Sequence, residues 1–316
     1  MKKILIVLFL FSTILFAKEV TVSIVPQKYF VEKIAKDKVK VNVMVTPGAS
    51  PATYEPKTSQ MRQLSKSDIY FSIDVPFEKA WLERFKSVNK KMLIVDTDEG
   101  IKKEQIAAHH HEDENHDDHE NHEAKNHDDH KNHGDEKHEE EDHHEEHKGE
   151  KHEHTGLDPH IWLDPILVKT QAKNIYEALV KIDEKNKEFY KNNLESFYKE
   201  LDDLNEKLEN ILKPYHDKAF MVFHPSWGYF ARRYDLKQIA IEIEGKEPKP
   251  AQLVELLEEA KENNIKIVFV APQFSKKGAK TISTTIKGNV VNIDPLASNW
   301  DENLIKVANE IANSYK

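Results

Sequence analysis

Apolar runs and amphipathic stretches alternate in the first part of the chain. The predicted strands are residues 20–25, 39–45, 69–73 and 92–95, and the predicted helices are residues 28–35 and 77–85. The run at 39–45 is the most regular, because valine occupies every second position from Val39 to Val45. Strands that alternate with helices predict a parallel sheet covered by helices on both faces.

The same alternation returns after a long helical segment at residues 165–212. Its most regular apolar stripe is Leu194, Phe197, Leu201, Leu204, Leu208 and Ile211. A helix over 184–212 is about 40 Å long at 1.5 Å per residue, long enough to brace two lobes. The strands predicted after it are 219–223, 238–243, 265–271 and 290–293, with helices at 227–234, 250–263, 275–286 and 302–315. The predicted fold class is therefore α/β, with two lobes that each have a mainly parallel sheet flanked by helices, bridged by a long helix.

The N-terminus has a different pattern. Met1, Lys2 and Lys3 precede an apolar run, residues 4–16, which ends at the small residue Ala17. This order is typical of a secretory signal peptide, and the run is shorter than the roughly 20 residues of a membrane-spanning helix. The alternative is an uncleaved N-terminal anchor. Since the chain has no Cys, a lipid anchor on cysteine is excluded, and we expect a periplasmic protein with a cleaved signal peptide.

The middle of the chain is dominated by histidine and acidic residues. Residues 109–154 contain 15 His, 19 Asp or Glu and 5 Lys, with almost no apolar residue. Such a segment cannot form a packed core, so it predicts a disordered surface loop. Imidazoles at this density favour low-affinity metal binding over a merely solvating linker. The densest blocks are His109, His110, His111, His143, His144 and His147.

These patterns divide the chain into five parts. They are a signal peptide (1–17), an N-terminal α/β lobe (18–104), a His/Asp/Glu-rich loop (105–156), a loop and connecting helix (157–213) and a C-terminal α/β lobe (214–316). The net charge of −10 comes from the His-rich loop, and the remainder of the chain is slightly positive. Because no basic stripe carries interleaved aromatic residues, nucleic-acid binding is not expected. The lack of Cys also excludes disulfides, cysteine zinc fingers and iron–sulfur clusters.

Three side chains lie where an open parallel sheet binds its ligands, beyond the carboxyl ends of strands or in a stiff loop. His224 and Asp294 each follow a predicted strand and precede a Pro, and His160 lies between the Asp-Pro pairs of residues 158–165. Two imidazoles and a carboxylate suit zinc. The alternatives are that the histidines only form hydrogen bonds and that Asp294 caps the turn at Leu296. Glu242 also lies near a strand end, from which it could reach the crevice, but we expect a surface charge.

The chain resembles the periplasmic zinc-binding solute-binding proteins of metal ABC importers, the ZnuA type of solute-binding protein family 9. The resemblance covers residues 20–315. It is carried by segments 47–56 and 158–165, by Phe223-His224-Pro225 with Trp227-Gly228-Tyr229-Phe230, and by Ile293-Asp294-Pro295-Leu296. It implies two α/β lobes bridged by a long helix, with the metal between them and His160, His224 and Asp294 as its ligands.

The sequence departs from the family pattern at one position. The family usually has a His in the first loop where this chain has Ala52, which cannot coordinate a metal. The missing ligand can be replaced by water, by Glu55, or by His152 or His154. We favour the two histidines, because they precede His160 by only a few residues and their effective concentration is high.

The resemblance implies binding rather than catalysis. The expected function is high-affinity capture of a divalent transition metal, with Zn²⁺ as the preferred ion, and its delivery to an ABC permease, by a monomer whose His-rich loop collects or senses metal. The alternatives are a manganese or iron carrier of the same family, a periplasmic metal chaperone or adhesin, and a zinc hydrolase. The hydrolase is disfavoured because the sequence has no His-Glu-x-x-His helix.

Overall fold

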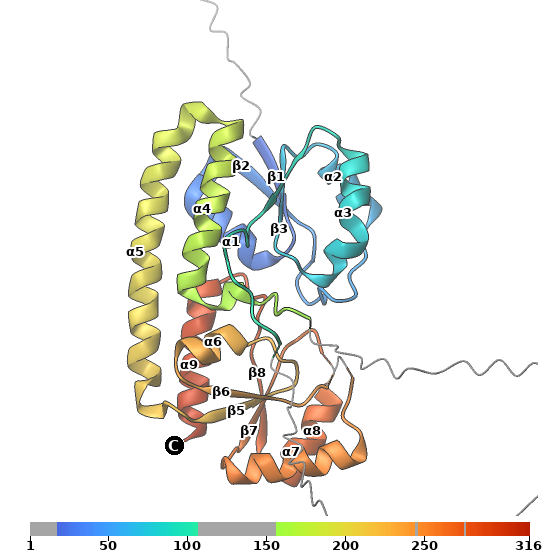
Figure 1. The fold of residues 1–316 in the computed structure, drawn as a ribbon, viewed down its shortest axis with the longest axis vertical. Coiled ribbons are helices and arrows are strands. Elements are labelled where there is room, and N and C mark those ends of the chain that lie inside the picture. The colour runs from blue at the N-terminus through green and yellow to red at the C-terminus, as the bar shows by residue number, and fades with distance from the viewer. Residues whose placement is uncertain (1–17, 107–155, 244–245, 275) are drawn as a thin grey trace, which may run out of the picture. The chain divides into compact units, whose positions relative to one another are not determined.

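Two four-stranded parallel sheets form the framework of the part of the protein that the structure describes (Figure 1). The computed structural model describes residues 18–106, 156–243, 246–274 and 276–316. The strand orders are β2-β1-β3-β4 and β6-β5-β7-β8, and every neighbouring pair is parallel. The predicted two-lobe α/β fold is confirmed. The predicted signal peptide and residues 109–154 of the predicted disordered loop lie outside the described residues.

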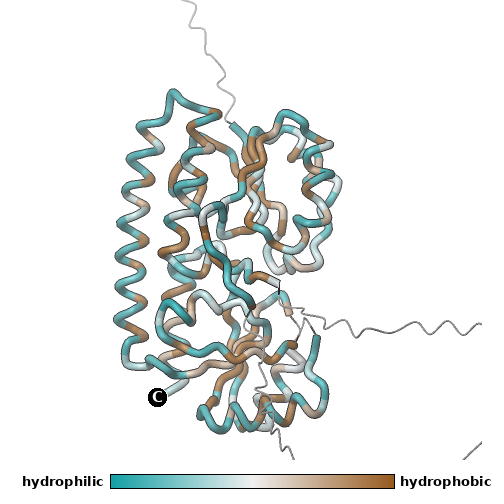
Figure 2. The backbone as a smooth tube through the Cα atoms, viewed as in Figure 1, coloured by the Kyte–Doolittle hydropathy of each residue, from teal (hydrophilic) through white to brown (hydrophobic). Residues whose placement is uncertain are grey.

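The first lobe precedes the His-rich segment. Its elements are β1 (Lys18–Val22), α1 (Val25–Ala35), β2 (Val39–Val43), α2 (Thr58–Leu64), β3 (Ile69–Ser72), α3 (Pro76–Val88) and β4 (Leu93–Asp96). The central strands β1 and β3 are the most buried of this sheet, with the last three residues of β1 and all four residues of β3 buried. Figure 2 shows brown, hydrophobic stretches of backbone in the middle of this lobe, where its strands run, and more hydrophilic colours on the surrounding helices and loops. This distribution is the one expected for a parallel sheet that is covered on both faces.

The second lobe repeats the arrangement. Its elements are β5 (Ala219–Val222), α6 (Gly228–Arg233), β6 (Lys237–Ala240), α7 (Pro250–Glu262), β7 (Ile267–Val270), α8 (Lys276–Thr285), β8 (Asn289–Asn292) and α9 (Trp300–Ser314). Each strand was predicted from the sequence to within three residues at either end. One face of this sheet has its own apolar core with α7 and α8, which includes Leu256, Ala260 and Ile282.

Two helices connect the lobes. They are α4 (Pro165–Ile182) and the 26-residue α5 (Lys187–Leu212), which runs beside both lobes in Figure 1. The apolar stripe of α5 packs as predicted, with Leu194, Phe197, Leu201, Leu204 and Leu208 buried. A single apolar core extends from the first sheet through these helices and α9 to the second sheet. The predicted bridging helix is therefore confirmed, and its buried stripe fixes it to both lobes.

Two details of the first lobe differ from the sequence prediction. Residues 20–25 were predicted as one strand, but β1 ends at Val22 and α1 begins at Val25. The Gln27 side chain accepts hydrogen bonds from the amides of Ser23 and Ile24, and Pro26 fits the first turn of a helix. The short helix α2 was not predicted, because its seven residues are mostly polar and only Gln60 and Leu64 are buried.

A turn of 3₁₀-helix at Ile161–Leu163 connects the functional loops of the two lobes. The Trp162 indole donates to the carbonyl of Pro295 at 2.7 Å, and the Trp300 indole donates to the carbonyl of Trp162 at 2.8 Å. Both indoles are buried, so these bonds are shielded from water. They hold the segment before α4 against the loop that follows β8.

Candidate metal centre

A cavity of about 300 Å³ receives side chains from both lobes. Its wall includes Ala52, Lys79, Ile106, Gly156, His160, His224 and Phe274. Loops at the carboxyl ends of strands in both sheets supply several of them, as expected for a ligand site of parallel sheets. Ala52 lines this wall, so the first loop reaches the cavity but offers it only a methyl group.

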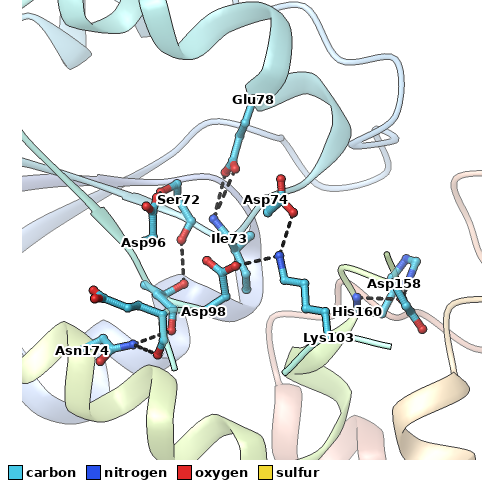
Figure 3. Close-up of polar contacts among 12 residues, drawn as sticks. Ser72, Ile73, Asp74, Glu78, Asp96, Asp98, Lys103, Asp158, His160 and Asn174 are labelled. Atoms are coloured by element: carbon cyan, nitrogen blue, oxygen red, sulfur yellow. Dashed lines mark hydrogen bonds and ion pairs between the residues drawn. The ribbon is translucent and has the colours of Figure 1, made fainter. Parts of the chain in front are cut away.

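His160 is held by a buried carboxylate. Its Nδ1 lies 2.6 Å from Oδ1 of Asp158, and its amide donates to the same oxygen at 2.9 Å (Figure 3). Asp158 is 2% exposed, and its carbonyl accepts a 3.0 Å bond from the Tyr229 hydroxyl. A Cβ on Gly228 would come within 3.0 Å of the Asp158 carboxylate, so a glycine there leaves room for it. Because Nδ1 is engaged, Nε2 is the nitrogen of His160 left to bind a metal.

His224 is held in the same way from the second lobe. It follows β5, and its Nδ1 lies 3.1 Å from Oε2 of Glu242, which follows the neighbouring strand β6. The Phe274 ring stacks on the imidazole, with ring centroids 4.5 Å apart and planes at 21°. The His160 and His224 ring centroids are 5.5 Å apart. Two imidazoles at that separation, each oriented by a carboxylate, form a pair of nitrogen donors suited to zinc.

Asp294 follows β8 and contacts two cavity-lining residues, but its carboxylate is occupied. Oδ1 accepts hydrogen bonds from the Gln273 amide and from the backbone of Leu296, both at 2.9 Å. Gln273 and Leu296 line the cavity, whereas Asp294 is not among its lining residues. In the part of the chain that the structure describes, no three His, Asp or Glu side chains are arranged to hold a metal ion. The structure therefore brings His160 and His224 together and shows Asp294 in its capping role.

The remaining predicted ligands divide into two groups. Glu55 is exposed and is not one of the cavity-lining residues. The others, His152, His154 and the six histidines of the densest blocks, lie outside the described residues. The described residues nearest to them, Ile106 and Gly156, are joined by a 3.3 Å backbone hydrogen bond and both line the cavity. The chain therefore leaves for the His-rich segment, and returns from it, at the cavity wall.

Sequence reasoning missed the two carboxylates that hold the histidines. Glu242 was expected to be a surface charge, which is wrong, because it is 9% exposed and bonded to His224. Only the strand order, which places β6 beside β5, could have revealed this pairing. Asp158 had a local signal in Asp158-Pro159-His160, because an aspartate readily bonds a group two residues further along the chain.

The corresponding edge of the first sheet carries a buried polar cluster. Its centre is Glu78, which is 1% exposed and accepts hydrogen bonds from the Ser23 hydroxyl and the Ile73 amide. Burial raises the pKa of Glu78 to about 7, although the bonds from Ser23 and the backbone lower it. Nearby, Lys103 binds both Asp74 and Asp98 (Figure 3). Burial alone would lower the pKa of Lys103, but these two carboxylates raise it above its ordinary value.

The two α/β lobes, the helix along both of them and the shared cavity define a two-lobed solute-binding protein. The family described as "ZnuA: Zinc-uptake complex component A periplasmic" matches residues 20–315, and the chain belongs to this family.

Individual relatives and solved structures agree. The chain is 35% identical over 286 residues to the "High-affinity zinc uptake system protein ZnuA" of Haemophilus influenzae, covering 88% of this chain and 85% of that protein. It is 39% identical to a solved "Crystal structure of ZnuA", with a TM-score of 0.78 over 95% of this chain and all of that one. A ZnuA deletion mutant solved with zinc bound gives 39% identity and a TM-score of 0.77 over 94% and 98%.

Proposed function

We propose that this protein captures Zn²⁺ with high affinity in the cavity between its lobes and delivers it to an ABC permease for import. The observation that carries the proposal is the pair His160 and His224, 5.5 Å apart and each oriented by a buried carboxylate. Membership of the zinc-uptake family and the zinc-bound relative support the choice of metal. Manganese is a poorer fit because it prefers oxygen ligands to imidazole.

The proposed tight site consists of His160, His224 and Asp294. For Asp294 to coordinate, its carboxylate must turn from both Gln273 and Leu296 or use its second oxygen. The candidates for a fourth ligand are His152, His154, Glu55 and water. Replacing both His152 and His154 by Ala and titrating zinc against a competing chelator tests the first two. An unchanged affinity would exclude them.

The proposed location is the periplasm, and the proposed role is binding rather than catalysis. Among the described residues, no helix is long and apolar enough to cross a membrane. After capture, the zinc-loaded protein docks on the permease, which opens the site. The histidines of residues 109–154 form a low-affinity collector or sensor. Deleting them should lower the total zinc per chain and leave one tight site.

The experiment that tests the proposal compares three histidine variants. His160→Ala and His224→Ala should each weaken tight zinc binding by more than the roughly 10- to 100-fold that loss of an outer partner costs. His216→Ala is the matched control, because His216 lies between Glu209 and Asp235 and does not line the cavity. Affinity is measured by chelator competition. Equal affinity of all three variants and the parent would refute the proposed site.

A further inference from the structure

The cavity is larger and more apolar than a bare metal ion requires. Its volume of about 300 Å³ corresponds to roughly ten water molecules at about 30 Å³ each. Pro51, Val75, Pro76, Phe274 and Leu296 contribute apolar surface to its wall, together with the two imidazoles. Mostly apolar walls with a few convergent polar groups are typical of sites for small organic molecules.

A lysine also lines this cavity. Lys79 is exposed on α3 and forms no ion pair with any described residue. The Asp74 carboxylate, which lines the same wall, is bonded at 2.8 Å to Lys103. An ammonium group in the wall of a cation site weakens cation binding by repulsion unless an anion lies between the two charges.

The first loop also provides no ligand for zinc at this wall. Zinc prefers four ligands, and Ala52 supplies none from the first loop. We propose that the cavity binds zinc together with a small organic carboxylate, which coordinates the metal at the position that Ala52 leaves open and pairs with Lys79. This inference rests on the proposed function. It selects, for that position, an external anion in place of His152, His154, Glu55 or water.

The chemistry that fits is a carboxylate next to a second metal-binding oxygen or nitrogen. Hydroxycarboxylates and free α-amino acids share this arrangement, and either would neutralise part of the zinc charge beside Lys79. The apolar wall formed by Phe274 and Leu296 would cover the carbon skeleton of the bound anion. Citrate and L-histidine are the probes that distinguish the two sources.

The test is equilibrium dialysis of the full chain with radiolabelled citrate or L-histidine, with and without zinc. When zinc is present, we expect each chain to retain about one molecule of one of the two probes. Without zinc, we expect neither probe to be retained. Lys79→Gln should weaken anion retention by about tenfold, since a bond to a charged group is lost. Lys86→Gln is the matched control, because Lys86 lies on the same helix, is exposed and pairs with Glu83 at 2.7 Å.

The outcomes separate this inference from the proposed function. If neither anion is retained with zinc, or if Lys79→Gln retains it as well as Lys86→Gln does, the inference is wrong and zinc capture stands. Zinc bound at residues 109–154 is common to both lysine variants and cancels in their comparison. If zinc affinity is also unaffected by His160→Ala and His224→Ala, the proposed function itself fails.

Discussion

The two lobes have the same strand order but use the corresponding edge of the sheet differently. In the first lobe, the residue after β1 is Ser23, which donates to the carboxylate of Glu78 in a fully buried cluster. In the second lobe, His224 follows β5, the corresponding strand, and is bonded to Glu242 while facing the cavity. Both edges place a buried carboxylate beside a side chain that follows the central strand.

The difference is whether that side chain can reach a ligand. The first lobe covers its cluster with Tyr70 and α3, so the buried carboxylate serves packing. The second lobe leaves His224 23% exposed in its side chain, so in the proposed site the carboxylate orients a donor for the metal. The nitrogen donor on the other side comes from His160, in the segment before α4. One topology therefore provides a sealed edge in one lobe and a binding edge in the other.

The largest expected effect comes from zinc at the second-lobe edge. At 1,000 times its Kd, zinc should stabilise the native protein by about 4 kcal/mol. At roughly 2–4 °C per kcal/mol for a protein of this size, Tm should rise by about 8–16 °C. His224→Ala should abolish the part of the shift that comes from the tight site, whereas Glu78→Gln should keep it. Thermal scans with and without zinc measure this, and superimposable scans of the parent protein would contradict it.

The second-largest expected effect is the pH dependence of folding stability that comes from the sealed edge of the first lobe. The pKa of Glu78 is raised to about 7 in the folded protein, from 4.5 when unperturbed. Between these values the folded state binds more protons than the unfolded state. The contribution of Glu78 to the stability of the folded state is therefore complete below pH 4.5, falls as pH rises and is lost above pH 7. The total loss is about 3 kcal/mol at 1.36 kcal/mol per pH unit.

Glu78→Gln should remove this pH dependence. Denaturant unfolding of both proteins at several pH values between 4 and 8 measures the difference, in which the histidine titrations cancel. Parallel stability curves would show that Glu78 does not titrate in this range. Zinc affinity at pH 7.5 should be unchanged in the variant, in contrast to variants of the second lobe.

The smallest effect concerns the carboxylates that orient the ligands. Glu242→Gln or Asp158→Asn keeps a hydrogen-bonding side chain but removes its charge, and should weaken zinc binding by about 10- to 100-fold. Chelator competition measures the affinity. Glu247→Gln is the control, because Glu247 is exposed on the same segment of the chain. Equal affinities for Glu242→Gln and Glu247→Gln would show that the second-lobe edge does not tune the metal.

Most of the fold could be predicted because its strands are short apolar or alternating segments that lie between turn residues and helices. Helix α2 was missed because it buries only two residues, and the start of α1 was misplaced because Val25 continues an apolar run. His160 and His224 could be predicted from their Pro-bounded loops and the family resemblance. The role of Glu242 could not, because it depends on which strands are neighbours, and the pattern of a single strand carries no information about its neighbour.

The hydrogen bond between Ile106 and Gly156 has a consequence for evolution and engineering. Since it holds the two points of departure together, the entropic cost of closing whatever joins them grows only slowly with its length. By this argument, segments with more or fewer histidines can join these two points at little cost in stability. The same junction is a natural place to graft a reporter domain, which would then report on events at the adjacent cavity wall.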